Sequence, residues 1–224
     1  MAYLKKGMIA AGLIILFILG ACNTKNADPY YKISNEFKQY CLYNQNSYWI
    51  YQNDTTGIKD SLKLSDVQDY VAFHSPDNTA GPYSFDVIDL DFDTTENLPM
   101  IKGSITAGNP TTGKEGTMRD LYWLFFKNGN YLLAFAPGFP LGEEQRLGDK
   151  PGFYTNIKKL STYSVNGVTY NDVYHTQVRK TEGTPDTVNY QFYFAKNYGL
   201  VKWTRSVKGE TTSYSLVGSD LIQN

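Results

Sequence analysis

The chain has 224 residues, and its 21 basic and 22 acidic side chains leave a formal net charge of -1. Because charges of both signs are mixed along the chain, no basic stripe points to nucleic acid or to an anionic surface. The 19 Tyr, 12 Phe and 3 Trp suit pleated, half-buried strands, although the same rings could line a sugar-binding face.

The N-terminus carries a short positive segment followed by an uncharged one. Lys5 and Lys6 precede a run from Gly7 to Ala21 that is rich in Ile, Leu, Phe, Gly and Ala. The run has about fifteen residues, which is too short for a bilayer-spanning helix and typical of a secretory signal peptide. We therefore expect residues 1–21 to be removed from the mature protein.

The signal peptide ends in Leu19-Gly20-Ala21-Cys22, which resembles a bacterial lipobox. This resemblance implies a diacylglyceryl group on the Cys22 sulfur, cleavage before Cys22 and acylation of the new amino group, for example with palmitate. Two or three acyl chains give a durable membrane anchor. An ordinary secretory peptide in which the cysteine stands by chance is the alternative.

Residues 22–29 read as a short flexible tether, because they are polar and lack periodicity. The residue after Cys22 is Asn23 and not the Asp that retains some lipoproteins in the inner membrane. An acidic surface-export cluster is also missing. We therefore expect an outer-membrane, periplasm-facing protein of the cell envelope, with surface exposure left open.

Cys41 has no intrachain partner if Cys22 carries lipid, so the fold is expected to stand without a disulfide. Ile33, Phe37, Tyr40 and Cys41 share one face of a helix, and we expect an amphipathic helix within residues 28–42. A buried core cysteine is the simplest interpretation. A reactive thiol would need a helix N-terminus or a nearby base.

Strand patterns dominate the remainder of the chain. The cleanest alternation places Ile88, Leu90 and Phe92 on one face and Asp89, Asp91 and Asp93 on the other. Turns are indicated at 53–57 and 75–78, and a loop at 109–116. Strands are expected at 47–51, 62–73 (as one or two strands), 83–93, 100–107, 121–126, 131–135, 160–165, 173–178, 188–195, 200–207 and 211–217.

Three features of the second half define its expected arrangement. Asn128-Gly129 joins two nearly continuous apolar strands, which predicts a central hairpin covered on both faces. The segment 137–152 is rich in Gly, Pro and charge, so we expect no strand there and at most one helical turn. The last three strands form a meander.

Two stretches resemble uncharacterised Bacteroidota lipoproteins. In residues 46–64 an aromatic strand precedes a Thr/Gly turn and an Asp-Ser strand. In residues 166–173 and 193–202 a Gly turn, an aromatic and a Val lead to a strand that ends in Gly-Leu-Val-Lys. The resemblance implies a strongly curved antiparallel sheet, similar to the half-barrels of lipoprotein carriers, and supplies no site residues.

The histidines offer little chemistry. His74 is expected at a strand end and His175 inside a strand, and neither neighbours a nucleophile motif. The sequence has no Gly-x-Ser-x-Gly elbow, His-x-x-x-His pair or phosphate-binding Gly loop. We therefore predict no catalytic residue, no metal ligand and no cofactor.

Carboxylates are the better candidates for chemistry. Asp89, Asp91, Asp93 and Glu96 could offer oxygens to a hard cation, but successive same-face residues on a strand lie about 7 Å apart. A solvated strand face is the simpler interpretation. A glycosidase would need two carboxylates across a cleft, and nothing in the sequence pairs any two of the candidates Asp86, Asp120, Glu143 and Glu144.

The sequence therefore predicts an all-β, mainly antiparallel domain over residues 30–224, built as one curved, half-barrel or barrel-like sheet with one or two short helices. We expect at least two of the three tryptophans, Trp49, Trp123 and Trp203, to be core residues. We expect a membrane-anchored, non-enzymatic binding module for a lipid, a glycan or an envelope protein. A carboxylate-dependent glycan hydrolase and a structural subunit of an envelope assembly are the alternatives.

Overall fold

The computed structural model describes residues 28–76, 81–108, 120–146, 152–181 and 187–223. The predicted signal peptide, the lipid-attachment residue Cys22, most of the tether and the predicted loop at 109–116 lie outside this part of the chain. Among the described residues, no helix is long and apolar enough to cross a bilayer.

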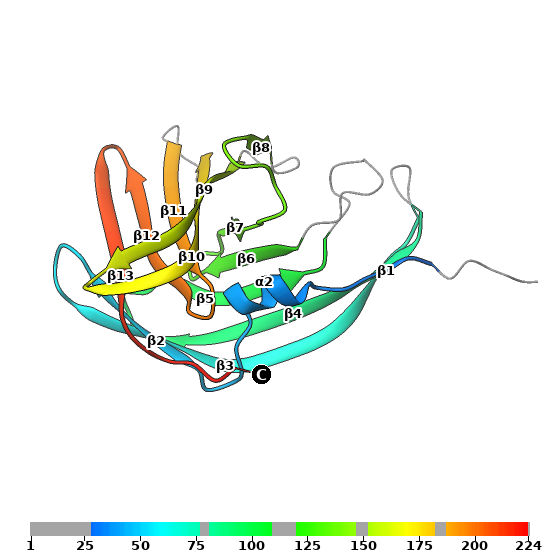
Figure 1. Ribbon diagram of the computed structural model, residues 1–224, viewed down its shortest axis with the longest axis horizontal. Helices are drawn as coiled ribbons and strands as arrows, with labels where there is room; N and C mark the ends of the chain where they lie inside the picture. Colours follow the sequence, from blue (N-terminus) through cyan, green and yellow to red (C-terminus); the bar gives the residue numbers. More distant parts are fainter. Residues whose placement is uncertain (1–27, 77–80, 109–119, 147–151, 182–186, 224) are drawn as a thin grey trace, which may run out of the picture.

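One large antiparallel sheet and one short helix make up the described fold (Figure 1). The helix is α2 (Asn35–Cys41). The strands are β1 (Tyr30–Tyr31), β2 (Tyr48–Asn53), β3 (Lys59–His74), β4 (Tyr83–Thr94), β5 (Met100–Thr106), β6 (Leu121–Phe126), β7 (Tyr131–Phe135), β8 (Glu144–Arg146), β9 (Gly152–Val165), β10 (Val168–Thr181), β11 (Thr187–Ala195), β12 (Gly199–Val207) and β13 (Glu210–Asp220).

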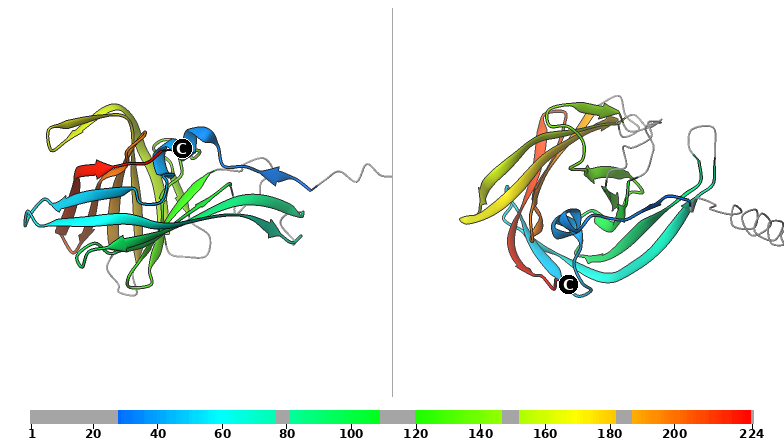
Figure 2. Two further views of the ribbon diagram at one scale, coloured as in Figure 1. Left: turned by 90° about the horizontal axis from the view of Figure 1, so that it is seen from below. Right: turned by 45° about the vertical axis from the view of Figure 1, so that its right-hand side comes forward.

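The sheet runs in the order β7-β6-β5-β4-β3-β2-β13-β12-β11-β10-β9-β8, and β1 pairs with β4 in parallel. The end strands β7 and β8 do not pair with each other, so the sheet remains unclosed. It curls around α2, which lies on the concave side (Figures 1 and 2). The predicted fold class, a single curved and mainly antiparallel sheet, is confirmed.

The side-chain alternation of the strands accounts for the core. Ile88 and Leu90 of β4 are buried, and Val188, Tyr190, Phe192 and Phe194 are all buried along β11. Because side chains alternate across a strand, each strand gives one face to the concave interior. The final meander β11-β12-β13 is present as predicted.

The helix is shorter than the sequence analysis predicts. It begins after Ser34, whose hydroxyl accepts a hydrogen bond from the Phe37 N–H, as expected of an N-cap. Phe37, Tyr40 and Cys41 are buried, which confirms the predicted apolar face. Residues 30–31 are not helical because their backbone extends the sheet at the edge of β4.

The hairpin of β6 and β7 is not central, which corrects the prediction. β7 is covered on both faces as expected, whereas Trp123 and Phe125 of β6 are only half-buried. β7 is the last strand of the sheet, yet residues 132–136 are all at most 2% exposed. They are buried because the curl brings β7 against β10 and β11 from the far end of the sheet. A continuous apolar run therefore indicates that a strand is buried, and it does not indicate whether the strand is central or at the edge of the sheet.

Side chains from β9 and β10 bind the free edge of β7 and the turn that follows it. The Thr176 hydroxyl donates to the Ala134 carbonyl at 2.7 Å. The Ala136 N–H donates to the Tyr154 hydroxyl at 2.9 Å, and the Asn156 amide donates to the carbonyls of Ala136 and Phe139 at 2.9 and 2.8 Å. Buried backbone groups that no strand pairs are thus satisfied by side chains.

The segment after β7 contains a strand that the sequence analysis excludes. Residues 144–146 form β8 and pair with β9 opposite residues 153–155. An edge strand of three residues needs only one paired neighbour, so charged side chains such as Glu144 and Arg146 are tolerated there. Strands β3, β9 and β10 are longer than predicted, and β3 is a single strand.

The side-chain bonds to β7 lead to a stability prediction. Asn156→Ala removes the donors to the Ala136 and Phe139 carbonyls and also the acceptor of the Tyr154 hydroxyl. We therefore expect the free energy of unfolding to fall by about 1–3 kcal/mol. Urea denaturation measures this change. Asn171→Ala, on an exposed position of β10, is the matched control and should change the stability by under about 0.5 kcal/mol. Equal effects of the two substitutions would contradict the assigned role of Asn156.

Candidate functional site

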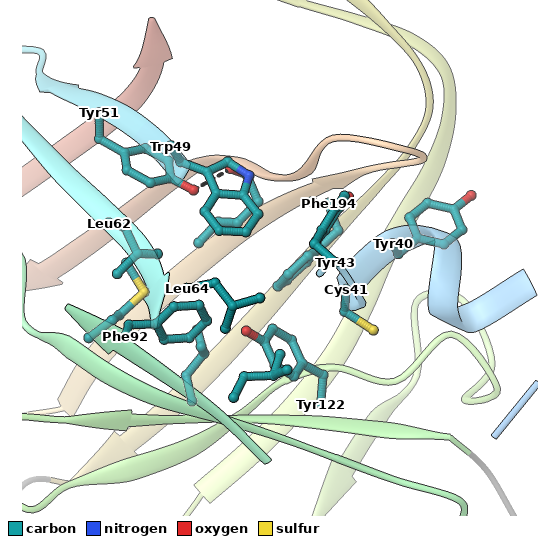
Figure 3. Close-up of a pocket in the computed structure, with 15 residues that line it drawn as sticks. Tyr40, Cys41, Tyr43, Trp49, Tyr51, Leu62, Leu64, Phe92, Tyr122 and Phe194 are labelled. Atoms are coloured by element: carbon teal, nitrogen blue, oxygen red, sulfur yellow. Dashed lines mark hydrogen bonds between the residues drawn. The ribbon is translucent and has the colours of Figure 1, made fainter. Parts of the chain in front are cut away.

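The interior holds a cavity of about 30 Å³ beneath the C-terminal end of α2 (Figure 3). Its walls come from α2, from β2 to β6 on one side of the curl, and from β11 and β12 on the other. Figure 3 shows Tyr43, Leu64 and Tyr122 pointing toward one another across it. The cavity is thus formed by segments that lie far apart in the sequence.

The aromatic walls of the cavity are fixed by hydrogen bonds and ring packing. The Tyr51 hydroxyl donates to the Leu200 carbonyl at 2.7 Å, and the Trp49 indole N–H donates to the Tyr198 carbonyl at 3.0 Å. The rings of Tyr43 and Trp49 meet edge to face with centroids 5.2 Å apart. These contacts hold each ring in one orientation.

Tyr122 occupies space that only a glycine neighbour leaves open. A Cβ atom on Gly103 would lie 2.6 Å from Cε2 of Tyr122, so no side chain fits on β5 at that point. The ring therefore lies directly over the β5 backbone. The Tyr122 ring thereby occupies space and keeps the cavity small.

The polar groups of the cavity are neutral at physiological pH. Burial is the main cause that raises the pKa of the Cys41 thiol and of the Tyr43 and Tyr122 hydroxyls well above their ordinary values. The Cys41 thiol donates to the Phe37 carbonyl at 3.4 Å, which agrees with the expected core cysteine. The lining includes no carboxylate, imidazole or amine among the described residues. Such a cavity supplies no general acid or base near neutral pH.

The volume of the cavity decides what it can hold. One water molecule needs about 10–15 Å³, so there is room for two or three. The Tyr43 hydroxyl is buried and has no hydrogen-bond partner among the described residues, so it suits a bound water. Sites for drug-sized ligands have volumes of about 300–1,000 Å³. An acyl chain does not fit.

The structure brings together two carboxylates that the sequence analysis could not pair. Asp86 accepts hydrogen bonds from the Tyr30 hydroxyl and, at 3.1 Å, from the Ile33 N–H. Asp120 accepts from the next amide, the Ser34 N–H, at 3.1 Å, and also from the Ser34 hydroxyl. The two carboxylates therefore bind consecutive amides of the chain. They hold the segment that leads into α2.

The other candidate carboxylates have protein partners or lie in solvent. Asp89 forms an ion pair with Lys102 at 2.8 Å, and Glu144 forms one with Arg179. Glu143 is exposed. The described part of the chain contains no group of three or more His, Cys, Asp or Glu side chains that could hold a metal ion. The face formed by Asp89, Asp91 and Asp93 lies opposite the buried Ile88 and Leu90, as the alternation predicts.

Both histidines stack on tyrosines. His74 lies 4.4 Å from the Tyr83 ring by centroids, and His175 lies 4.3 Å from the Tyr193 ring. His175 also shares a hydrogen bond with Gln191 at 2.9 Å. Burial is the largest cause acting on the pKa of His175 and lowers it, so the ring is uncharged at neutral pH.

Tyr193 is stacked against two rings, His175 and Tyr163, the second at 4.5 Å with an interplanar angle of 10°. These rings lie on strands β9 to β11 and pack face to face. A sugar platform needs a free ring face, and this stack covers both faces of Tyr193. Of the tryptophans, Trp49 and Trp203 are buried, which confirms the core prediction for two of the three.

Comparison with known proteins identifies only remote structural likeness. No protein-family model and no curated protein matches the sequence. A candidate lipoprotein of Parabacteroides distasonis is 12% identical with a TM-score of 0.36, and a candidate exported protein of Bacteroides fragilis with a YmcC-like fold is 10% identical with a TM-score of 0.29. Each comparison covers 82% of this chain and 97% of the other. At these scores the likeness carries no functional argument.

The buried hydroxyls predict a loss of stability in alkali. Tyrosine in the unfolded chain ionises with its ordinary pKa of about 10, whereas burial keeps the pKa of Tyr43, Tyr51 and Tyr122 higher in the folded chain. The unfolded state therefore releases these protons first. The free energy of unfolding should be at its full value below about pH 9 and should fall above about pH 10, by up to about 1.4 kcal/mol per pH unit for each such tyrosine. Urea denaturation across this range measures it, and a value that stayed constant to about pH 11 would contradict the burial.

The size of the cavity predicts that no free lipid is carried inside the domain. The Cys22→Ser protein, which has no attachment sulfur, should give the mass of the bare polypeptide in native mass spectrometry. Denatured protein from the same sample is the control for covalent adducts. A fatty acid or phospholipid retained in one-to-one ratio would contradict a filled interior.

Proposed function

We propose that this chain is a lipid-anchored protein of the outer membrane whose β domain is a non-enzymatic module that binds a glycan or another envelope protein on its outer surface. The filled interior is the observation that carries this proposal. In the part of the chain that the structure describes, the cavity beneath α2 has room for two or three water molecules, which favours partners that bind on the outer surface.

The anchor is proposed on the N-terminal sequence. A positive segment, an apolar run of signal-peptide length and Leu19-Gly20-Ala21-Cys22 occur in the order that lipidation requires. The tether that follows leads to β1, which pairs with β4 at one end of the sheet. The domain would therefore be held to the membrane by that end.

We propose that the domain is not an enzyme because hydrogen bonds to the backbone already occupy two of its candidate catalytic carboxylates. Asp86 and Asp120 both accept hydrogen bonds from the backbone before α2, on consecutive amides. A glycan hydrolase needs one carboxyl group with a raised pKa and a second that faces it across the substrate. We assign Asp86 and Asp120 a structural role.

Substitution of each of the two cysteines of this chain tests the proposed anchor and provides its matched control. Cys22→Ser should move the protein from the membrane fraction to the soluble fraction and abolish labelling with radioactive palmitate. Cys41→Ser is the control, because Cys41 is buried in the core and its replacement should leave labelling and fractionation unchanged. Membrane retention of the Cys22→Ser protein would overturn the proposal.

A further inference from the structure

The hairpin of β3 and β4 extends beyond its neighbours in the sheet. β2 pairs with β3 only up to Lys63, and β5 pairs with β4 only from Val87 onward. Residues 70–74 and 83–86 therefore form an arm, which lies at one end of the longest axis of the molecule (Figure 1). β1 lies along this arm.

One face of the arm is packed by its own rings. Tyr83 stacks on His74, meets Tyr31 edge to face at 5.9 Å and lies 5.7 Å from Phe85. Tyr83 is 4% exposed although it lies outside the main core cluster. This packing gives the arm a rigid backing.

The other face of the arm carries exposed apolar side chains. Phe73 is 60% exposed, Val71 is 58% exposed and Tyr30 of β1 is 48% exposed. The register places Tyr30, Ser84 and Phe73 in one row across β1, β4 and β3, at about 4.8 Å per strand. Tyr30 and Phe73 therefore lie within about 10 Å of each other on one face.

The length of the tether determines how far this face can be from the membrane. The Ser84 N–H donates to the Pro29 carbonyl at 2.9 Å, so the chain is attached to the arm up to residue 29. A fully extended chain covers at most about 3.6 Å per residue, so the stretch from Cys22 to Pro29 spans at most about 25 Å. An acylated Cys22 would hold the arm, and not the far end of the domain, at the bilayer surface.

We propose that the exposed face of the arm, formed by Tyr30, Val71 and Phe73, rests in the interfacial region of the membrane that holds the anchor. This inference relies on the proposed lipidation of Cys22. Aromatic side chains are favoured at the boundary between headgroups and acyl chains. The proposal depends on one observation, namely that this exposed apolar face lies close to the residue proposed to carry the lipid.

The open edge of β3 limits the depth of this contact. No described strand pairs with β3 on the β2 side beyond Leu64, so backbone N–H and C=O groups of that edge need water. Backbone groups without partners are not tolerated in the hydrocarbon core. The side chains of Phe73 and Val71 reach into the interface while the backbone stays among the headgroups.

The contact does not depend on anionic lipid. Lys32 lies 5.5 Å from the Tyr30 ring, and Asp86 accepts the Tyr30 hydroxyl. Asp69 also acts on Tyr30, so two negative charges and one positive charge flank the patch. No basic cluster is present among the described residues of this face to bind acidic headgroups. Vesicles of zwitterionic phosphatidylcholine are therefore the appropriate probe.

The test uses the full lipidated chain in phosphatidylcholine vesicles whose acyl chains carry bromine, which quenches tryptophan fluorescence at short range. Phe73→Trp reports on the arm, and Ile58→Trp is the matched control. Ile58 is exposed and precedes the opposite end of β3, about 50 Å from Phe73 along the strand. Wild-type protein gives the signal of the three native tryptophans, which is subtracted.

We expect the Phe73→Trp emission to be quenched at least about threefold more than that of Ile58→Trp, with a shift to shorter wavelength. Equal quenching of the two reporters, in protein whose Cys22 carries the acyl adduct by mass spectrometry, would overturn the arm contact and leave the anchor intact. Absence of the adduct would overturn the proposed anchor and this inference together.

Discussion

The packing of Phe135 inside the curl is the interaction on which the remaining structure depends. Phe135 ends β7, the last strand of the sheet, and stacks on Phe37 of α2 at 5.2 Å and on Phe194 of β11 at 4.9 Å. One ring thereby joins an edge strand, the helix and the opposite half of the sheet. Burying a phenylalanine contributes roughly 1.5–3 kcal/mol, and this one is 0% exposed. The ring pairs Tyr122–Phe194 and Phe126–Tyr190 join β6 to β11 beside it.

The same packing relates the fold to the proposed function. Because β7 and α2 occupy the concave side, the cavity that the described residues leave beneath α2 has space for two or three water molecules and none for an acyl chain. The open edge of β7 is covered by hydroxyl and amide groups of Thr176, Tyr154 and Asn156, so it is not available for strand addition. Recognition is thus left to the outer surface, and the arm of β3 and β4 is its most exposed apolar part near the N-terminus.

Local patterns in the sequence predicted the elements better than their arrangement. Alternation along β4 and β11 predicted the strands and their buried faces, because a strand's periodicity is local. The apolar run of β7 could not distinguish a central strand from an edge strand buried by curling. The pairing of Asp86 with Asp120 was also beyond sequence reasoning, since it depends on contacts across 53 and 86 positions of the chain. Of the ionisable groups that line the candidate cavity, the helical pattern indicated only Tyr40 and Cys41, because the other lining tyrosines among the described residues have no spacing that indicates a site.

Amide hydrogen exchange at Ala136, the residue directly after β7, tests the sealing of the interior most directly. If the Tyr154 hydroxyl accepts the Ala136 N–H inside the curl, this amide should exchange as slowly as the amides of the central strand β11, through global unfolding. Exchange at the rate of an exposed strand edge would mean that the curl opens, that the interior admits solvent and that the account of a filled domain is wrong.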